Sequence, residues 1–202
     1  MKTVVGTNET RTPRLASRIN EVTLYPYWNM PRTILMSEWF DAIKDNRAVL
    51  DFHELEIVDS GGNVIPYERI KWSHMSHRNF PYSIRQKTGC ANPLGVVKFG
   101  MHNPYDVYLH DSPGKGSFEG KNRYYSHGCV RVADAVALAK ALLPGQIDEQ
   151  YLAACFTGQQ PKVLQVPEPV PVFIVYMTAD ADTSGRVTYY KDVYQLAEKK
   201  AP

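Results

Sequence analysis

The sequence predicts a mainly β fold that carries a few helices and one inserted region. Short runs of alternating apolar and polar residues, the pattern of half-buried strands, recur along the chain. Strong helical periodicity is confined to one stretch, residues 132–143. At 202 residues the chain is long enough for one domain with its own core and a sizeable insertion.

In the first part of the chain, strands are predicted over residues 1–7 and 18–25, the second from its alternating pattern. An aromatic turn then leads into a predicted helix over residues 31–43, with Pro31 near its first turn.

The pattern becomes irregular beyond that helix. A strand-like run at residues 52–58 ends in a turn rich in Gly and Asn, which is a strong reversal signal. We interpret residues 31–80 as an inserted helical and irregular lid. The main domain is then formed by residues 1–30 and 81–202, and it lacks its first strands if the chain is a fragment.

Regular patterns return in the second half, where strands are predicted over residues 82–86, 96–101 and 106–110. A helix is predicted to follow Cys129 directly, over residues 130–143. The remaining predicted elements are a shorter helix, a proline-broken connector and the two strands of a hairpin: residues 148–157, 161–171, 172–178 and 186–190.

The composition argues against several classes of partner. A net charge of +2, without a cluster of Lys and Arg, argues against nucleic acid. No apolar run is long enough to cross a bilayer. The first residues lack the charged and apolar regions of a signal peptide, so we expect a fragment or mature form of a longer protein.

Three cysteines are an odd number for a disulfide framework. If Cys129 is a working thiol, two alternatives stay open for Cys90 and Cys155. They form a disulfide bond in an oxidising compartment, or they remain two buried thiols.

Cys129 and His110 are the candidate catalytic pair. A thiol attacks as its thiolate, and the pKa of an unperturbed cysteine is about 8.5. The start of the helix predicted after Cys129 would favour the thiolate, and an imidazole would accept the proton. We favour His110 as the base, because it comes from a separate strand, over His127. The amides of Gly128 and Cys129 would form an oxyanion hole.

Two other interpretations use the same residues. A lone buried cysteine is usually inert packing. A zinc site would draw its ligands from this set: His110, His127, Cys129, and His74 or His77. No Cys-x-x-Cys or His-x-x-x-His pairing supports the zinc site, so we rank it below the thiol enzyme.

The segment Ser126-His-Gly-Cys-Val-Arg131, with fifteen residues between it and His110, resembles the signature of the L,D-transpeptidase catalytic (YkuD) domain family. Other segments resemble the large periplasmic Gram-negative branch of this family: residues 26–31, 82–86, 103–113 and 192–194. The resemblance implies a mixed β-sandwich or barrel with a helix after the catalytic cysteine. It also implies that the inserted lid caps the substrate, and that the protein is periplasmic.

For the site, the resemblance implies that Cys129 is the acyl-accepting nucleophile and His110 the proton acceptor and donor. No metal or organic cofactor is needed for such covalent chemistry. His127, Gly128 and Ser126 would line the site, with the Gly128 backbone near the oxyanion position.

Further roles are implied around this pair. The backbone carbonyl of Asp111 would orient His110, with the Asp111 side chain as the alternative. Arg131 would meet a substrate carboxylate or brace the loop, and we favour bracing. Tyr108 and Trp28 match positions that line the cleft, although core packing explains both equally well.

The implied reaction is a two-step acyl transfer on peptidoglycan. The thiol would attack the bond between diaminopimelate and D-alanine in a stem tetrapeptide. The acyl group would then pass to the side-chain amine of a second diaminopimelate, giving a 3–3 crosslink. Water or a free D-amino acid as acceptor would instead make a carboxypeptidase or an exchange enzyme.

The resemblance also implies that carbapenem-type β-lactams acylate the same thiol. A papain-like or NlpC-type peptidase is a weaker alternative, because those enzymes usually place cysteine before histidine in the chain. A wall-binding module without turnover is the alternative from another class, and it would need neither Cys129 nor His110.

Overall fold

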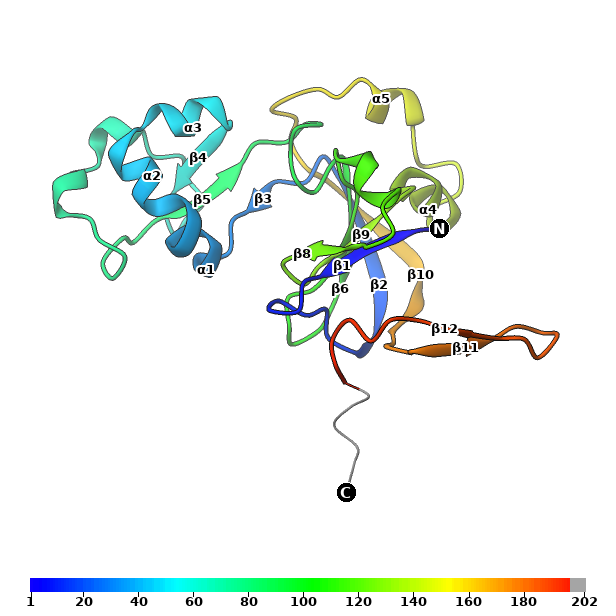
Figure 1. Ribbon diagram of the computed structural model, residues 1–202. Coiled ribbons are helices and arrows are strands. Elements are labelled where there is room, and N and C mark those ends of the chain that lie inside the picture. The colour runs from blue at the N-terminus through cyan, green and yellow to red at the C-terminus, as the bar shows by residue number, and fades with distance from the viewer. Residues whose placement is uncertain (197–202) are drawn as a thin grey trace.

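The structure, a computed structural model, describes residues 1–196 (Figure 1). Seven strands form its main sheet: β1 (Thr3–Gly6), β2 (Leu15–Leu24), β6 (Val97–Met101), β7 (Leu109–His110), β8 (Tyr124–Ser126), β9 (Val130–Val132) and β10 (Lys162–Ile174). Their order is β10-β2-β6-β7-β9-β1-β8, with both parallel and antiparallel neighbours. The predicted fold, mainly β with a few helices, is confirmed.

The main core forms between this sheet and two helices, α4 (Ala135–Leu142) and α5 (Glu149–Ala153). Phe99 of β6 and Val22 of β2 are fully buried in it, and Ala139 lets α4 approach closely. Burying an apolar side chain of this size contributes about 1.5–3 kcal/mol to stability. The core therefore fixes β6, and through it the neighbouring strand β7.

The inserted region has a small sheet of its own, with strands β3 (Trp28–Asn29), β4 (Leu55–Val58) and β5 (Ser83–Gln86) in the order β3-β5-β4. Its helices are α1 (Arg32–Ile34), a π-helical segment (Leu35–Trp39), α2 (Phe40–Asp45) and α3 (Ala48–Phe52). Two 3-10 turns follow, Tyr67–Arg69 and Trp72–His74. The predicted helix after Pro31 is thus present, and α3 was not predicted.

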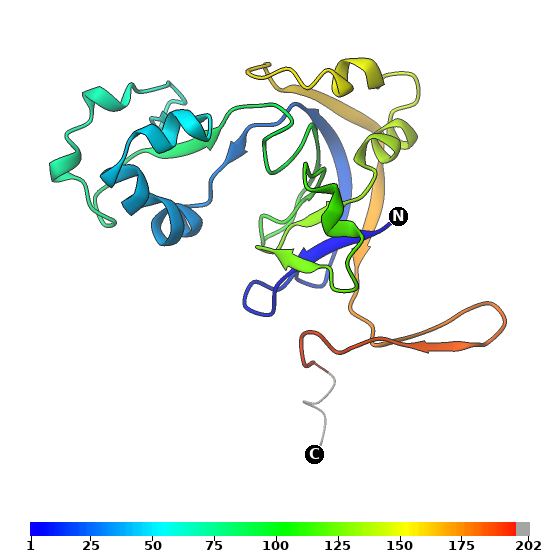
Figure 2. The same ribbon diagram turned by 45° about the horizontal axis from the view of Figure 1, so that its top comes forward.

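A separate cluster of buried side chains, including Phe40, Trp72 and Phe80, holds these elements together. Figures 1 and 2 show the inserted region standing to one side of the main sheet. Because β3 and β5 belong to its sheet, this unit includes residues just outside 31–80 at both ends.

The helix predicted to start directly after Cys129 is wrong, because residues 130–132 form β9. Val130 and Val132 are β-branched and buried, and β9 pairs with β7 and with β1. Helix α4 begins only after Asp134, whose side chain accepts a hydrogen bond from the Ala137 amide (2.9 Å). A strand therefore separates Cys129 from the N-terminus of α4.

The connector predicted over residues 161–171 is also wrong, because these residues lie mostly in β10. Its prolines are tolerated because β10 is the edge strand and pairs with β2 alone. The pairing shifts register between Gln165 and Val170, where two of the prolines stand.

The predicted hairpin exists, but its strands are β11 (Ala179–Ala181) and β12 (Val187–Tyr189). The first strand predicted for it, residues 172–178, instead completes β10 and the bend that follows. No helix within residues 1–196 combines the length and the apolar character needed to cross a membrane.

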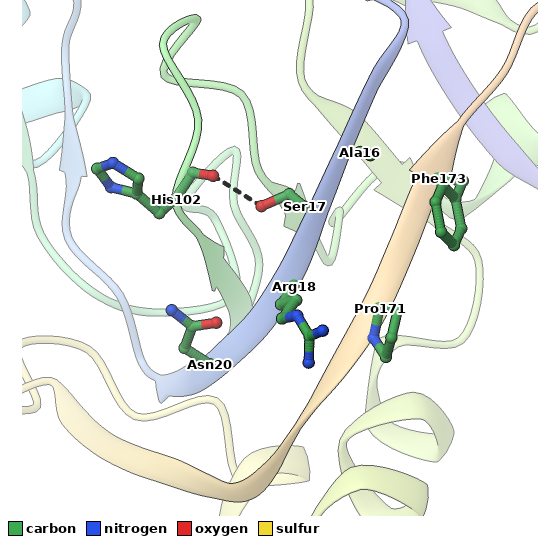
Figure 3. Close-up of a pocket in the computed structure, with 7 residues that line it drawn as sticks. All are labelled: Ala16, Ser17, Arg18, Asn20, His102, Pro171 and Phe173. Carbon is green, nitrogen blue, oxygen red and sulfur yellow. Dashed lines mark hydrogen bonds between the residues drawn. The ribbon is translucent and has the colours of Figure 1, made fainter.

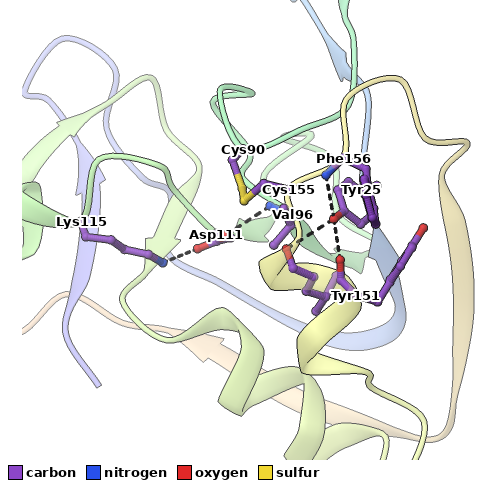
Figure 4. The surroundings of a disulfide bond; sticks show 9 residues. Tyr25, Cys90, Val96, Asp111, Lys115, Tyr151, Cys155 and Phe156 are labelled. Atoms are coloured by element: carbon purple, nitrogen blue, oxygen red, sulfur yellow. Dashed lines mark hydrogen bonds and ion pairs between the residues drawn. A yellow bond between two sulfur atoms is a disulfide. The ribbon is translucent and has the colours of Figure 1, made fainter.

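Cys90 and Cys155 form a disulfide bond (Figure 4). The bond joins the segment that enters β6 to the residues that follow α5. Beside it, the Tyr25 hydroxyl donates to the Tyr151 carbonyl (2.7 Å) and accepts from the Phe156 amide (3.3 Å). Of the two alternatives left open by the sequence, the structure contains the disulfide.

Replacing both Cys90 and Cys155 by serine is expected to lower the free energy of unfolding by about 4 kcal/mol, because the bridge spans a sequence separation of 65. The measurement is denaturant unfolding of the double variant and of the oxidised wild-type chain. Reducing the wild-type chain should bring its midpoint down to that of the variant. Equal midpoints for the oxidised chain and the variant would contradict a stabilising bridge.

Candidate active site

A cleft of about 760 Å³ lies between the inserted region and the main sheet. It contains most of the residues singled out from the sequence: Cys129, His110, His127, Ser126, Arg131, Tyr108 and Trp28. The cleft is therefore the candidate active site.

Adjacent strands bring Cys129 and His110 into this cleft. Strands β7 and β9 are parallel, with Leu109 opposite Val130 and His110 opposite Arg131. His110 ends β7, and Cys129 immediately precedes β9. Because neighbouring strands lie about 4.8 Å apart, the two side chains enter the cleft from neighbouring positions.

The backbone orients the His110 ring, which is 4% exposed. Its Nδ1 donates to the Asp111 carbonyl (2.5 Å), which leaves Nε2 as an acceptor. Burial lowers the pKa of His110 to about 4, against the opposing effect of the bond to Asp111, and nearby Arg131 lowers it further. The imidazole is therefore neutral at pH 7, as a proton acceptor must be.

The Asp111 side chain has other partners. It accepts hydrogen bonds from the Val96 amide (3.2 Å) and from Lys115 Nζ (2.5 Å) (Figure 4). Of the two orienting groups considered for His110, the Asp111 carbonyl makes the contact and the carboxylate does not.

Cys129 is a free, partly exposed cysteine whose Sγ lies 3.9 Å from the Asp106 carbonyl oxygen. Burial raises the pKa of the thiol, and hydrogen bonding with Tyr108 opposes this rise. The expectation that a helix N-terminus lowers the pKa is wrong, because β9 follows the thiol. At neutral pH the pair is thus a thiol and a neutral imidazole, so the proton must move as the sulfur attacks.

Residues 126–129, the thiol loop, are shaped by Ser126. Its hydroxyl donates to the Cys129 carbonyl (2.6 Å) and accepts from the Gly128 amide (3.2 Å). The φ of Gly128 is 120°, a region that disfavours residues with a side chain. Since the Gly128 amide is occupied, it is not free for an oxyanion. For the Cys129 amide, no acceptor is found within residues 1–196.

The family model for the L,D-transpeptidase catalytic domain (YkuD) matches residues 1–167, which include Cys129, His110 and the whole inserted region. This chain belongs to that family.

A protein of Haemophilus influenzae, provisionally named an L,D-transpeptidase, is 32% identical to this chain over 194 residues. The match covers 96% of this chain and 39% of that protein, so the chain spans about two fifths of its relative. The match to the relative extends beyond residue 167, where the family model ends.

In this L,D-transpeptidase domain, His127 faces the inserted region. Its Nε2 lies 3.2 Å from Oε1 of Glu38 in the π-helical segment, and both side chains are about half exposed. The pair links the thiol loop to the inserted region. Nε2 of His127 is thus directed toward Glu38 of the inserted region.

Arg131 lines the cleft with its Nε buried, and this atom has no hydrogen-bond partner in the described part of the chain. Tyr108 packs beneath Lys98, whose Nζ lies 4.4 Å from the ring centroid. Burial raises the pKa of Tyr108, so its hydroxyl stays protonated across the neutral range. Trp28 forms the opposite wall, at the start of β3.

Sequence reasoning missed Thr10 and Thr12, which lie in the loop between β1 and β2. The Thr10 hydroxyl donates to the Ser126 carbonyl (2.9 Å), and the Thr12 hydroxyl donates to the Gly128 carbonyl (2.8 Å). Both therefore restrain the thiol loop, and Thr10 also lines the cleft. The sequence signal for them was the recurrence of threonine, at Thr7, Thr10 and Thr12, in a segment that otherwise has the composition of a loop.

Within residues 1–196, no group of three or more His, Cys, Asp or Glu side chains is placed to hold a metal ion, so the zinc alternative finds no ligand set. A second hollow, about 450 Å³, lies beside β2 and β10 (Figure 3). Its lining residues differ from those of the cleft: Ala16, Ser17, Arg18, Asn20, His102, Pro171 and Phe173. It is therefore separate from the thiol.

Proposed function

We propose that this chain is a peptidoglycan L,D-transpeptidase that forms 3–3 crosslinks through an acyl group on Cys129. The observation that carries the proposal is that a free thiol and a neutral imidazole line the same cleft of a domain of this family. The donor is a stem tetrapeptide and the acceptor the side-chain amine of a second stem's diaminopimelate.

In the acylation step, the thiol turns from Asp106 toward the carbonyl between diaminopimelate and D-alanine. His110 Nε2 takes the thiol proton as the S–C bond forms, and the Cys129 amide donates to the oxyanion. The C–N bond then breaks, and His110 returns the proton to the leaving amine. D-alanine departs, and a thioester remains on Cys129.

In the second step, the acceptor amine attacks the thioester carbonyl and passes its proton to His110. The C–S bond breaks, and the sulfur leaves with that proton as a thiol. Each proton and each bond is accounted for by two side chains and two peptides, so no step needs a metal or an organic cofactor.

The cleft walls suggest how the donor is held. Arg131 carries a buried nitrogen with no partner within residues 1–196. A nitrogen without a protein partner favours contact with a carboxylate of the stem peptide over the bracing role preferred from the sequence. Trp28 and Tyr108 would cover the apolar parts of the same peptide. The inserted region would cap it, with the Glu38–His127 pair at the edge of the cap.

A periplasmic location accords with the Cys90–Cys155 disulfide, because such bonds persist in oxidising compartments. Carbapenem-type β-lactams, which acylate nucleophiles, are proposed as covalent inhibitors at Cys129.

The test is incubation with a disaccharide-tetrapeptide, followed by mass spectrometry. The proposal expects loss of D-alanine together with crosslinked dimers. Loss of D-alanine without dimers would identify a carboxypeptidase, and incorporation of an added D-amino acid an exchange enzyme. Binding without any product would support the wall-binding module and refute the enzyme.

The pH profile follows from the lowered pKa of His110. Its charged form cannot accept a proton, so kcat/KM should fall only as pH drops toward about 4. Most of the neutral-pH activity is therefore expected to remain at about pH 5. Initial rates of D-alanine release across this range give the measurement. An acid limb centred near the ordinary histidine value of 6.5 would contradict the buried, neutral imidazole.

A further inference from the structure

The C-terminal segment after β12 returns to the main domain (Figure 1). Tyr194 is its anchor, 4% exposed and stacked on Tyr176 with the ring centroids 5.1 Å apart. The guanidinium of Arg11 lies over the Tyr194 ring, 5.6 Å from its centroid. This tyrosine lies beyond residue 167, where the family model ends.

The Tyr194 hydroxyl connects this anchor to the loop between β1 and β2. It donates to the Gly6 carbonyl (2.8 Å) and accepts from the Thr12 amide (3.3 Å). The Thr12 hydroxyl accepts from the Gly6 amide (2.8 Å) and donates to the Gly128 carbonyl (2.8 Å). Gly6, Thr12 and Tyr194 thus form a hydrogen-bonded network, and Thr12 connects this network to the thiol loop.

The hydrogen bond from Thr12 to the Gly128 carbonyl has a geometric consequence for the active site. The Gly128 carbonyl and the Cys129 amide belong to one planar trans peptide unit, so they point in opposite directions. Fixing the carbonyl therefore fixes the direction of the amide. Gly128 has no side chain to resist rotation of that unit. Ser126 holds the two flanking peptide units, and the hydrogen bond from Thr12 restrains the Gly128 carbonyl itself.

We propose that Tyr194 is a positioning residue for the L,D-transpeptidase reaction, which acts through Thr12 to aim the Cys129 amide at the oxyanion. The inference rests on the proposed function, because it assigns the Cys129 amide to the acyl intermediate. It extends the active site to a segment outside the matched family domain.

The test uses Tyr194→Phe, which keeps the ring and removes the hydroxyl, with Tyr189→Phe in the exposed hairpin as the control. Two rates are compared. Release of D-alanine from the disaccharide-tetrapeptide passes through an oxyanion, whereas alkylation of Cys129 by iodoacetamide does not. A side chain that merely stabilises the fold would change both rates in step.

We expect kcat for D-alanine release to fall about tenfold in Tyr194→Phe with little change in KM, a part of the loss seen when an oxyanion donor is removed outright. The alkylation rate should stay within about twofold of the control, since its transition state does not need that donor. The inference would be overturned if kcat for D-alanine release fell by less than about fivefold, or if D-alanine release and alkylation slowed by the same factor.

A second pair of variants keeps the inference testable if Tyr194→Phe does not fold. Thr12→Ser retains the hydroxyl and should keep kcat, whereas Thr12→Val removes it and should reproduce the selective loss of D-alanine release. Equal kcat in these two variants would overturn the inference. A wild-type chain that releases no D-alanine would defeat the proposed function itself, and with it this inference, whereas an active wild-type chain with an unaffected Tyr194→Phe would defeat the inference alone.

Discussion

Replacing Cys129 by alanine is expected to reduce D-alanine release by roughly 10³-fold or more, because the variant has no sulfur to carry the acyl group. The loss should appear in kcat. Binding of the donor depends on other cleft residues, so its Kd should change little. Single-turnover mass spectrometry adds a direct readout, since the mass of the acyl-enzyme should be present in the wild-type chain and absent from the variant.

The disulfide leaves Cys129 as the one thiol that can react in this experiment. With Cys90 and Cys155 bridged, Cys129 is the one free cysteine of the three, all of which the structure describes. Iodoacetamide should therefore add one mass increment to the wild-type chain and none to Cys129→Ala. Thermal unfolding of the two proteins should agree closely, because the thiol is partly exposed and its hydrogen bonds with Asp106 and Tyr108 are weak ones. If Cys129→Ala kept about a tenth of the wild-type rate of D-alanine release, Cys129 would not be the nucleophile.

The candidate catalytic pair could be selected from the sequence because its residues lie in a short segment with a specific pattern. Cys129 follows a glycine that must adopt positive φ, and His110 ends a strand that pairs directly with the strand after Cys129. Local sequence carries the first feature. The second is a property of the folded sheet, because the sequence predicted a helix directly after Cys129. The resemblance to the family implied the Asp111 carbonyl as the orienting group, and the structure contains its hydrogen bond with His110 Nδ1.

The support for the thiol loop was not predictable, because it comes from far along the chain. Thr12 and Gly128 are separated by 116 residues, and Tyr194 and Gly6 by 188. No local propensity records such a contact, and only the folded sheet brings the partners together. The sequence marked residues 192–194 by resemblance alone and gave no physical role to Tyr194.

Two errors in the predicted fold have a similar origin. Residues 130–132 are too few for periodicity to separate a helix from a strand, and pairing with the neighbours β1 and β7 decides for the strand. The prolines of β10 argue against a central strand, yet they are compatible with an edge, and the position of a strand within a sheet is a property of the whole fold. Correcting the first error changes the expected chemistry: no helix N-terminus favours the thiolate of Cys129, so its ionisation depends on proton transfer to His110.

Replacing His110 by alanine is therefore expected to lower kcat for D-alanine release by about 10²–10⁴-fold, the usual contribution of a general base. The thiol pKa is raised by burial, so little thiolate forms without the base near neutral pH. Alkylation of Cys129 should also slow, in contrast to Tyr194→Phe, and should recover as pH rises and the thiolate forms directly. His74→Ala, at an exposed position of the inserted region, is the matched control.

The same variant has a stability signature with a defined sign. The pKa of His110 is lowered from 6.5 to about 4 on folding, so the unfolded chain binds a proton between these values that the folded chain excludes. Stability of the wild-type chain should be fully present above pH 6.5 and decline as pH falls toward 4. His110→Ala should lack this part of the decline, as denaturant midpoints across the window would show. An identical decline in both proteins would mean that the imidazole is charged in the cleft, and a charged imidazole cannot take the thiol proton.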